Sequence, residues 1–188
     1  MGGMLNEAMV KRKTLTEFEC LKIIQNLLKG LAYLAKNDIM HRDVKPPNIV
    51  LRTAEDIYDI VLVDMGFAIK IEDSIKDANS DFCVGSPGYI APEMLRGLPF
   101  DCKADVFSAG ATLYIMMAFR PAFYSHNRDN VIKLNRQCQP DFRINEWPEC
   151  NYNYTEEILE LLELMLKREP KERPTAQQCL DHEAFKLL

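Results

Sequence analysis

The chain contains 188 residues, 47% of them hydrophobic, and carries a formal net charge of −5 at pH 7. This size and composition predict one domain over residues 1–188 with a substantial core, and neither a membrane-spanning apolar run nor a secretory leader pattern occurs in the sequence. The negative charge argues against nucleic acid as a partner, because phosphate binding normally requires a basic surface.

The cysteines indicate reduced thiols. None of the six belongs to a C-x-x-C pair, so we expect neither a zinc site nor a disulfide framework. This pattern fits an intracellular, cytoplasmic protein. The cysteines occupy positions 20, 83, 102, 138, 150 and 179.

The first long predicted helix lies over residues 16–36. Thr16 and Glu19 can form a capping box, and Leu15 can pack against the first turn. Leucine and isoleucine then recur at helical spacing up to Lys36. The far end of this helix should carry the loop that follows it.

Two short runs rich in β-forming residues come next, over 49–51 and 60–63, and they bracket the segment 54–59. This pattern predicts a small β-hairpin. The ends of its strands should direct Asn48 and Asp64 toward one cleft.

The rest of the chain is predicted to be helical. Residues 104–118 are apolar nearly all round, as in a helix surrounded by protein. A second helix should run from a cap at Thr155 to about Lys167, and Thr175 with Gln178 forms another capping box. The expected fold class is therefore mainly α with a small β-hairpin region.

Residues suited to phosphoryl transfer concentrate beside the hairpin. Such a reaction needs oxygen ligands for Mg²⁺, a cation for the phosphates and a carboxylate for the acceptor hydroxyl. Asn48 and Asp64 fit the metal roles, Lys45 the cation and Asp43 the carboxylate. The two segments read His41-Arg42-Asp43-Val44-Lys45-Pro46-Pro47-Asn48 and Asp64-Met65-Gly66.

Taken singly, these residues have simpler interpretations. Asp64-Met65-Gly66 is also typical of an ordinary exit from a strand into a turn, and His41 is compatible with a buried structural histidine. The complete set at this spacing favours phosphoryl-transfer chemistry.

The chain resembles the eukaryotic protein kinase family, in its serine/threonine branch, and specifically the C-terminal lobe (C-lobe). Residues 41–48 resemble the catalytic loop H-R-D-x-K-x-x-N, and residues 64–66 resemble the metal-binding D-F-G with Met in place of Phe. Residues 85–93 resemble the end of an activation segment, G-[ST]-P-x-Y-x-A-P-E. Asp105 opens the helix that is buried in this family, and Arg173 matches its arginine segment before the last helix.

The resemblance implies a serine/threonine protein kinase that transfers the γ-phosphoryl group of ATP to a protein substrate. Asp43 and Lys45 would be catalytic, Lys45, Asn48 and Asp64 would bind the nucleotide, and Asn48 and Asp64 would hold Mg²⁺. His41 is the first residue of the resembling loop.

Further residues are assigned supporting roles by the same resemblance. The Ser86 hydroxyl would bridge the catalytic Asp and Lys, and Asp105 would accept hydrogen bonds from the backbone of the catalytic loop, a role compatible with capping its own helix. Glu93 and Arg173 would form a buried ion pair.

The motifs of the upper, N-terminal kinase lobe do not occur in these residues. There is no G-x-G-x-x-G and no V-A-I-K-like strand. We therefore expect the chain alone to be weakly active or inactive. The alternative is a truncated, non-catalytic kinase-like module that binds a protein partner through its peptide platform; a purely structural helical scaffold would have no need for the spaced polar set.

Regulation and substrate choice can be considered by the same resemblance. Arg42 could pair with an activating phosphate on Ser74 or Ser80, added by another kinase or controlled by a regulatory partner, although Phe82 stands where many relatives have Thr. Kinases that select arginine carry acidic residues at positions that here are Met4, Pro47 and Ile115. We therefore expect no strong preference for arginine.

Overall fold

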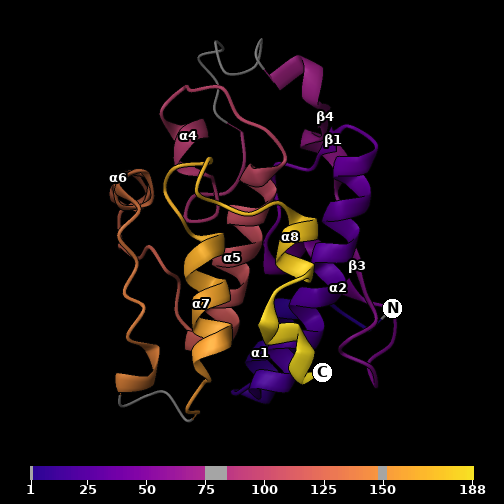
Figure 1. The fold of residues 1–188 in the computed structure, drawn as a ribbon. Coiled ribbons are helices and arrows are strands. Elements are labelled where there is room, and N and C mark those ends of the chain that lie inside the picture. The colour runs from indigo at the N-terminus through magenta and orange to yellow at the C-terminus, as the bar shows by residue number, and fades with distance from the viewer. Residues whose placement is uncertain (1, 75–83, 148–151) are drawn as a thin grey trace.

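The computed structural model describes residues 2–74, 84–147 and 152–188. A central helix, α5 (Lys103–Ala118), forms the middle of the fold, and nearly all of its side chains are buried. Helices α2 (Glu17–Lys36) and α7 (Glu156–Met165) pack against it, and α8 (Ala176–Leu180) packs on α2 (Figure 1). The helix predicted to be surrounded by protein is therefore confirmed.

Helix α2 begins as predicted. The Thr16 hydroxyl accepts a hydrogen bond from the Glu19 amide at 3.2 Å, and the Glu19 carboxylate accepts one from the Thr16 amide at 2.8 Å. The Glu19 carboxylate also pairs with Arg12, at the end of α1 (Leu5–Arg12). This capping box is confirmed, and it ties the two N-terminal helices together.

The predicted hairpin is confirmed. Strands β2 (Ile49–Leu51) and β3 (Ile60–Leu62) are antiparallel, with Ile49 opposite Leu62 and Leu51 opposite Ile60. A second antiparallel pair, β1 (Ile39–Met40) with β4 (Ile69–Lys70), was not expected. The described elements are mainly helical with these two small sheets, which confirms the predicted fold class.

Helix α7 differs from its prediction. It ends at Met165, two residues earlier than expected, and the hydroxyl of its N-cap residue, Thr155, does not cap it. Instead, the Thr155 hydroxyl and amide both donate hydrogen bonds to the Glu17 carboxylate, at 2.5 and 2.9 Å. The predicted capping role of Thr155 is wrong because the first turn of α2 binds this residue.

At α8, the capping box formed by Thr175 and Gln178 is confirmed.

Two further helices lie beside residues 85–93, the segment that we call the platform. They are the short α4 (Pro92–Leu95) and α6 (Arg128–Gln137), which contact each other. Single 3-10 turns lie at Pro46–Asn48, Met65–Phe67, Ile71–Asp73, Ile144–Glu146 and Glu183–Leu187. Among the helices that the structure describes, none combines the length and the apolar character needed to span a membrane.

The described cysteines are free thiols at positions 20, 102, 138 and 179, and those at 83 and 150 lie outside the described residues. Burial raises the pKa of both Cys102 and Cys179 to about 12. These thiols are therefore poor nucleophiles, because the thiolate is the reactive form.

Candidate functional site

The 41–48 loop lies between β1 and β2 and is attached to the central helix by Asp105. The Asp105 carboxylate accepts hydrogen bonds from the amides of His41 at 2.7 Å and Arg42 at 2.8 Å. Burial raises the pKa of Asp105, and these two backbone bonds oppose the rise. The carboxylate does not cap α5, whose N-cap residue is Cys102. Asp105 thus holds the loop in a conformation where Arg42 has φ +66°.

His41 connects this loop to the segment before Asp64. Its buried ring accepts a hydrogen bond at Nδ1 from the Asp43 amide at 3.2 Å. The other ring nitrogen, Nε2, lies 3.0 Å from the Val63 carbonyl oxygen and must carry the proton there, because a carbonyl oxygen can only accept. His41 therefore links the 41–48 loop to the strand end that leads to Asp64.

Asp43, Lys45 and Ser86 form one connected cluster. The Lys45 ammonium lies 2.7 Å from Asp43 Oδ2 and donates to the Ser86 hydroxyl at 2.6 Å. The Ser86 hydroxyl in turn donates to Asp43 Oδ1 at 2.8 Å. Asp43 is almost fully buried, so these charge-assisted bonds hold its carboxylate in one orientation.

Asn48 joins the same cluster. Its amide nitrogen donates to the Asp43 backbone oxygen at 2.8 Å and to Asp43 Oδ2 at 2.9 Å. Its own backbone oxygen accepts from the Val63 amide at 2.9 Å, which places it beside the strand end that leads to Asp64.

The Asp64 turn, residues 64–67, is much more exposed than the loop. Asp64 has φ +66°, and its Oδ1 accepts a hydrogen bond from the Gly66 amide at 3.2 Å. Within the described ranges, Asp64 Oδ2 and Asn48 Oδ1 have no hydrogen-bond partner, so two oxygen atoms remain available. Carboxylate and amide oxygens are the ligands that Mg²⁺ prefers, and this donor set fits the ion.

The Arg42 side chain is hydrogen-bonded to the Asp64 turn. Its Nε donates to the Phe67 carbonyl oxygen at 2.7 Å, and its side chain is buried. Of the two phosphorylation candidates, Ser74 is only 3% exposed, whereas Ser80 and the neighbouring Phe82 lie outside the described residues. The burial of Ser74 argues against its hydroxyl as an accessible acceptor of phosphate.

The 85–93 segment is attached at both ends. At its start, Gly85 has φ +115°, and a Cβ there would lie 2.9 Å from the Arg42 carbonyl oxygen. At its end, Arg173 donates to the two carboxylate oxygens of Glu93 at 2.7 and 3.0 Å, and both side chains are buried. This is the ion pair that the resemblance implied.

Two supporting residues escaped the sequence analysis. Asn135, on α6, is fully buried, and its Oδ1 accepts a hydrogen bond from the Gly88 amide at 3.0 Å. Ser108, on α5, donates to the Tyr89 carbonyl oxygen at 2.7 Å. The detectable signal for Asn135 was a polar residue on the buried face of an amphipathic helix, and for Ser108 a polar residue in a helix that is apolar nearly all round; a buried polar side chain must find a partner.

The three positions considered for arginine selection are Met4, Pro47 and Ile115. Met4 and Pro47 are exposed and Ile115 is half-buried. Their surroundings do not test the expected substrate preference, which stays a prediction.

Known proteins are similar to this chain over almost its whole length. A sequence model of a family described as protein kinase domain matches residues 1–185. Calcium-dependent protein kinase 5 of Plasmodium berghei (strain Anka) is 34% identical over 184 residues, which cover 98% of this chain and 31% of that protein. Calcium/calmodulin-dependent protein kinase type II of Caenorhabditis elegans is 34% identical over 179 residues, which cover 95% of this chain and 24% of that protein.

A further relative, calcium-dependent protein kinase 4 of Plasmodium falciparum (isolate 3D7), is 31% identical over 189 residues. That alignment covers 100% of this chain and 34% of the relative. The chain therefore spans about a third or less of the length of these relatives.

Proposed function

Because the chain belongs to the eukaryotic protein kinase family, we propose that it transfers the γ-phosphoryl group of ATP to a Ser or Thr hydroxyl of a protein substrate. The observation that carries this proposal is the Asp43, Lys45 and Ser86 cluster, in which a buried carboxylate, an ammonium group and a hydroxyl are hydrogen-bonded together. Its geometry suits a reaction that depends on positioning and charge.

In this proposal, Asp43 orients the acceptor hydroxyl of the substrate and accepts its proton. Lys45 offsets the negative charge that develops on the transferred group. Ser86 holds both side chains in place, and the attachment of the loop to Asp105 keeps the whole arrangement rigid.

Asn48 and Asp64 would hold Mg²⁺ through their available oxygen atoms. When bound, the ion neutralises phosphate charge and orients the phosphoryl group. The hydrogen bonds from Asn48 to Asp43 keep these two residues at a fixed distance. The bound metal would therefore stay correctly placed relative to the hydroxyl that accepts the phosphoryl group.

We further infer that residues 1–188 form the C-lobe of the kinase domain. Motifs typical of that lobe occur in these residues, with Met65 in place of Phe in D-F-G, whereas the glycine-rich loop and strand lysine that grip ATP phosphates do not. We therefore expect weak binding of MgATP to these residues alone. Tight binding measured by calorimetry would contradict this inference.

The test is phosphoryl transfer from γ-labelled ATP by the full gene product, with peptide libraries that offer Ser, Thr or Tyr. We expect transfer to Ser and Thr. The variant Asp43→Asn should lower the rate by roughly 10²- to 10⁴-fold, the range typical of a lost general base.

The matched control is Asp181→Asn, an exposed carboxylate that follows α8. It should leave the rate unchanged. Equal rates for the wild-type protein and Asp43→Asn would refute the catalytic assignment, and a preference for Tyr peptides would refute the Ser/Thr assignment alone. Arginine-flanked peptides in the same libraries test the expected lack of arginine selection.

A further inference from the structure

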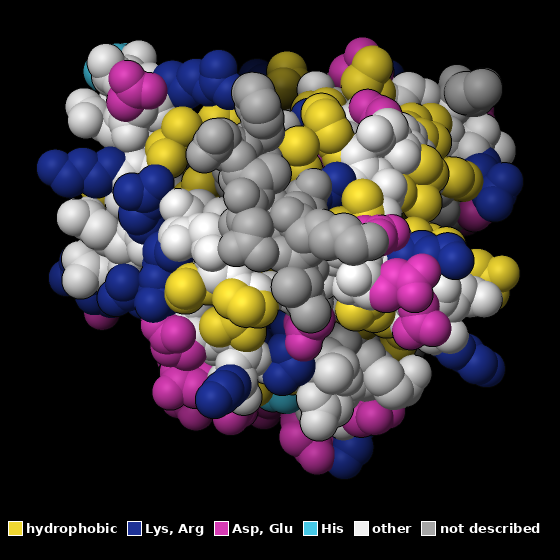
Figure 2. Space-filling view, turned by 90° about the horizontal axis from the view of Figure 1, so that it is seen from above, with side chains coloured by type: hydrophobic (Ala, Val, Ile, Leu, Met, Phe, Trp, Pro, Cys, Tyr) yellow, Lys and Arg dark blue, Asp and Glu magenta, His cyan; other side chains and the backbone are white. Residues whose placement is uncertain are grey.

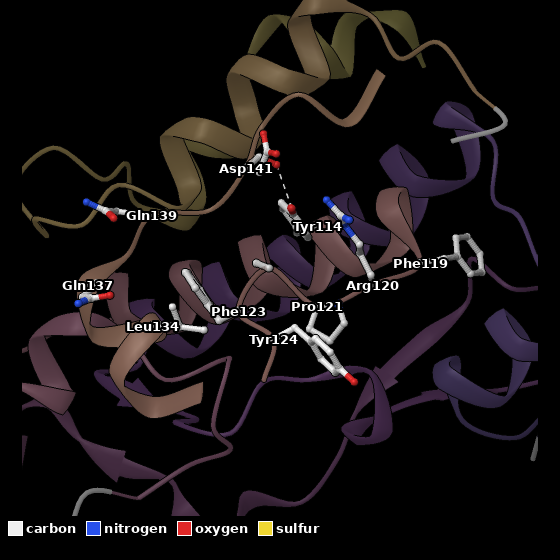
Figure 3. A pocket seen from close by; sticks show the side chains of 11 residues that line it. Tyr114, Phe119, Arg120, Pro121, Phe123, Tyr124, Leu134, Gln137, Gln139 and Asp141 are labelled. Carbon is white, nitrogen blue, oxygen red and sulfur yellow. Dashed lines mark hydrogen bonds between the residues drawn. The ribbon is translucent and has the colours of Figure 1, made fainter. Parts of the chain in front are cut away.

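A cavity of about 590 Å³ lies between the end of α5 and α6, in residues to which the proposed reaction gives no role (Figure 3). We call it the α6 cavity. Its size is within the range of ligand-binding pockets, and its walls are mostly aromatic and aliphatic. It is lined by Tyr114, Phe119, Arg120, Pro121, Ala122, Phe123, Tyr124, Leu134, Gln137, Gln139 and Asp141.

The cavity exposes apolar side chains to solvent. Tyr124 is 61% exposed, and Phe119 and Leu134 are each 39% exposed. Side chains of this kind provide anchor sites in protein interfaces, because burying them against a partner removes apolar area from water.

The cavity also carries a positive charge, on Arg120, that no carboxylate of the described residues neutralises. The Arg120 guanidinium stacks on the Trp147 ring at 3.3 Å from its centroid and extends beside Tyr114. The nearby Asp141 is already paired, because Arg143 donates two hydrogen bonds to its carboxylate at 2.9 Å each. This pairing holds the pKa of Asp141 at about 2.

Two further cations lie on α6. Lys133 is one helical turn before the lining residue Gln137 and so shares its helix face, whereas Arg136 directly precedes Gln137 and lies on a neighbouring face of the helix. Within the described residues, neither they nor Arg120 have a carboxylate within 4.0 Å. Figure 2 shows Lys and Arg side chains gathered at the edge where Figure 1 places α6. This is a local positive surface on a chain with net charge −5.

The α6 cavity adjoins a second cavity, which lies on the side of the molecule that carries residues 87–89. A smaller cavity of about 160 Å³ shares the wall formed by residues 121–124 and reaches Pro87, Gly88 and Tyr89. These residues directly follow Ser86, which contacts Asp43. A segment bound in the α6 cavity would therefore lie next to the platform rather than on an unrelated face.

We propose that the α6 cavity binds an acidic segment of a partner protein. An aromatic or aliphatic side chain of that segment enters the apolar part of the cavity, and flanking Asp or Glu residues meet Arg120 and Lys133. The combination of exposed apolar walls and unneutralised cations selects this partner, because a basic segment would be repelled and a neutral one would leave the cations unpaired. The surface acts as a docking site distinct from the transfer of phosphate.

The test measures equilibrium binding without nucleotide, so its outcome is independent of kinase activity. Labelled nonapeptides with a central Phe or Leu flanked by Asp and Glu are titrated with the chain by fluorescence anisotropy. We expect these peptides to bind, more weakly as salt is raised, and the same anchors flanked by Lys to bind at least roughly tenfold more weakly.

Variants separate the two parts of the proposal. The double variant Arg120→Glu, Lys133→Glu should weaken binding by roughly tenfold or more, and Tyr124→Ala, which alters an exposed side chain, should weaken it without changing the charge. The matched control is Lys11→Glu, an exposed cation on α1, which should bind like the wild type. Circular dichroism checks that each variant is folded.

Several outcomes would overturn the proposal. These are no binding of the acidic peptides at millimolar concentration, equal binding of the Lys-flanked peptides, or an equal loss in the Lys11→Glu control. Concentration-dependent self-association that Tyr124→Ala abolishes would identify a second copy of the chain as the occupant instead, and would also refute an acidic partner segment.

Discussion

The 41–48 loop and the Asp64 turn are joined by hydrogen bonds, yet the chain supports them to different degrees. His41, Arg42, Asp43 and Asn48 are all at most 8% exposed, whereas Met65 is 47% and Phe67 41% exposed. The loop is attached to α5 through Asp105 and to the platform through Ser86, while Asp64 has a single short-range bond to Gly66. The residues that would orient a substrate hydroxyl, and with them the metal-ligand candidate Asn48, are thus built into the core, whereas the other metal-ligand candidate, Asp64, lies at the surface.

The largest expected effect comes from the ion pair that supports the platform. Glu93→Gln leaves the buried Arg173 without a counter-charge, and we expect the free energy of unfolding to fall by about 3 to 5 kcal/mol. Denaturant unfolding followed by circular dichroism measures the loss. The control Glu169→Gln, in a partly exposed pair with Arg96, should cost less than about 1 kcal/mol. Equal losses would mean that burial of the first pair does not matter.

The attachment of the loop to α5 should be the next most sensitive point. Asp105→Asn replaces one acceptor oxygen by a donor and leaves a buried amide of His41 or Arg42 unsatisfied, at a cost of about 1 to 3 kcal/mol. The same unfolding measurement applies. Asp101→Asn, an exposed carboxylate just before α5, should change stability by less than about 0.5 kcal/mol and serves as the control.

Gly85 tests the close approach of the platform to the loop. Gly85→Ala adds a Cβ at φ +115° and 2.9 Å from the Arg42 carbonyl oxygen, so we expect a loss of about 1 to 3 kcal/mol. In Gly30→Ala, on the exposed face of α2, the added Cβ meets nothing within 4 Å. That change should stabilise the chain by about 0.4 to 1 kcal/mol, and the opposite signs of the two effects are the result to look for.

The smallest effect is expected at the Asp64 turn. Met65→Phe changes a side chain that is 47% exposed, and the free energy of unfolding should change by less than about 0.5 kcal/mol. A loss as large as that of Asp105→Asn would show that the turn is as firmly supported as the loop, and the contrast between the two regions would fail.

The elements that sequence predicted well are those fixed by local interactions. The boxes at Thr16 and Thr175 use partners three residues away, and the hairpin is fixed by two short runs with few residues between them. Thr155 failed as a cap because its partner, Glu17, lies 138 residues away in sequence. The pairing of β1 with β4 was missed for the same reason, since two-residue strands carry no periodic signal.

The site shows the same division. The spacing of Asp43, Lys45 and Asn48 was sufficient to expect them together, and resemblance supplied Ser86 and Arg173. Asn135 could not be found this way, because nothing local in α6 points to Gly88. The α6 cavity likewise arises from segments that meet only in the folded chain. The catalytic and metal roles of the site residues remain predictions until activity is measured.

The contacts of Asp43 set a limit on what else this carboxylate can accept. A carboxylate offers about four lone-pair positions. Asn48 and Lys45 both bind Oδ2, and Ser86 binds Oδ1, so one position remains, on the oxygen that already faces a hydroxyl. A water molecule and a substrate hydroxyl must therefore compete for that position. The ratio of ATP hydrolysis to protein phosphorylation would then measure how completely a docked substrate displaces solvent from Asp43.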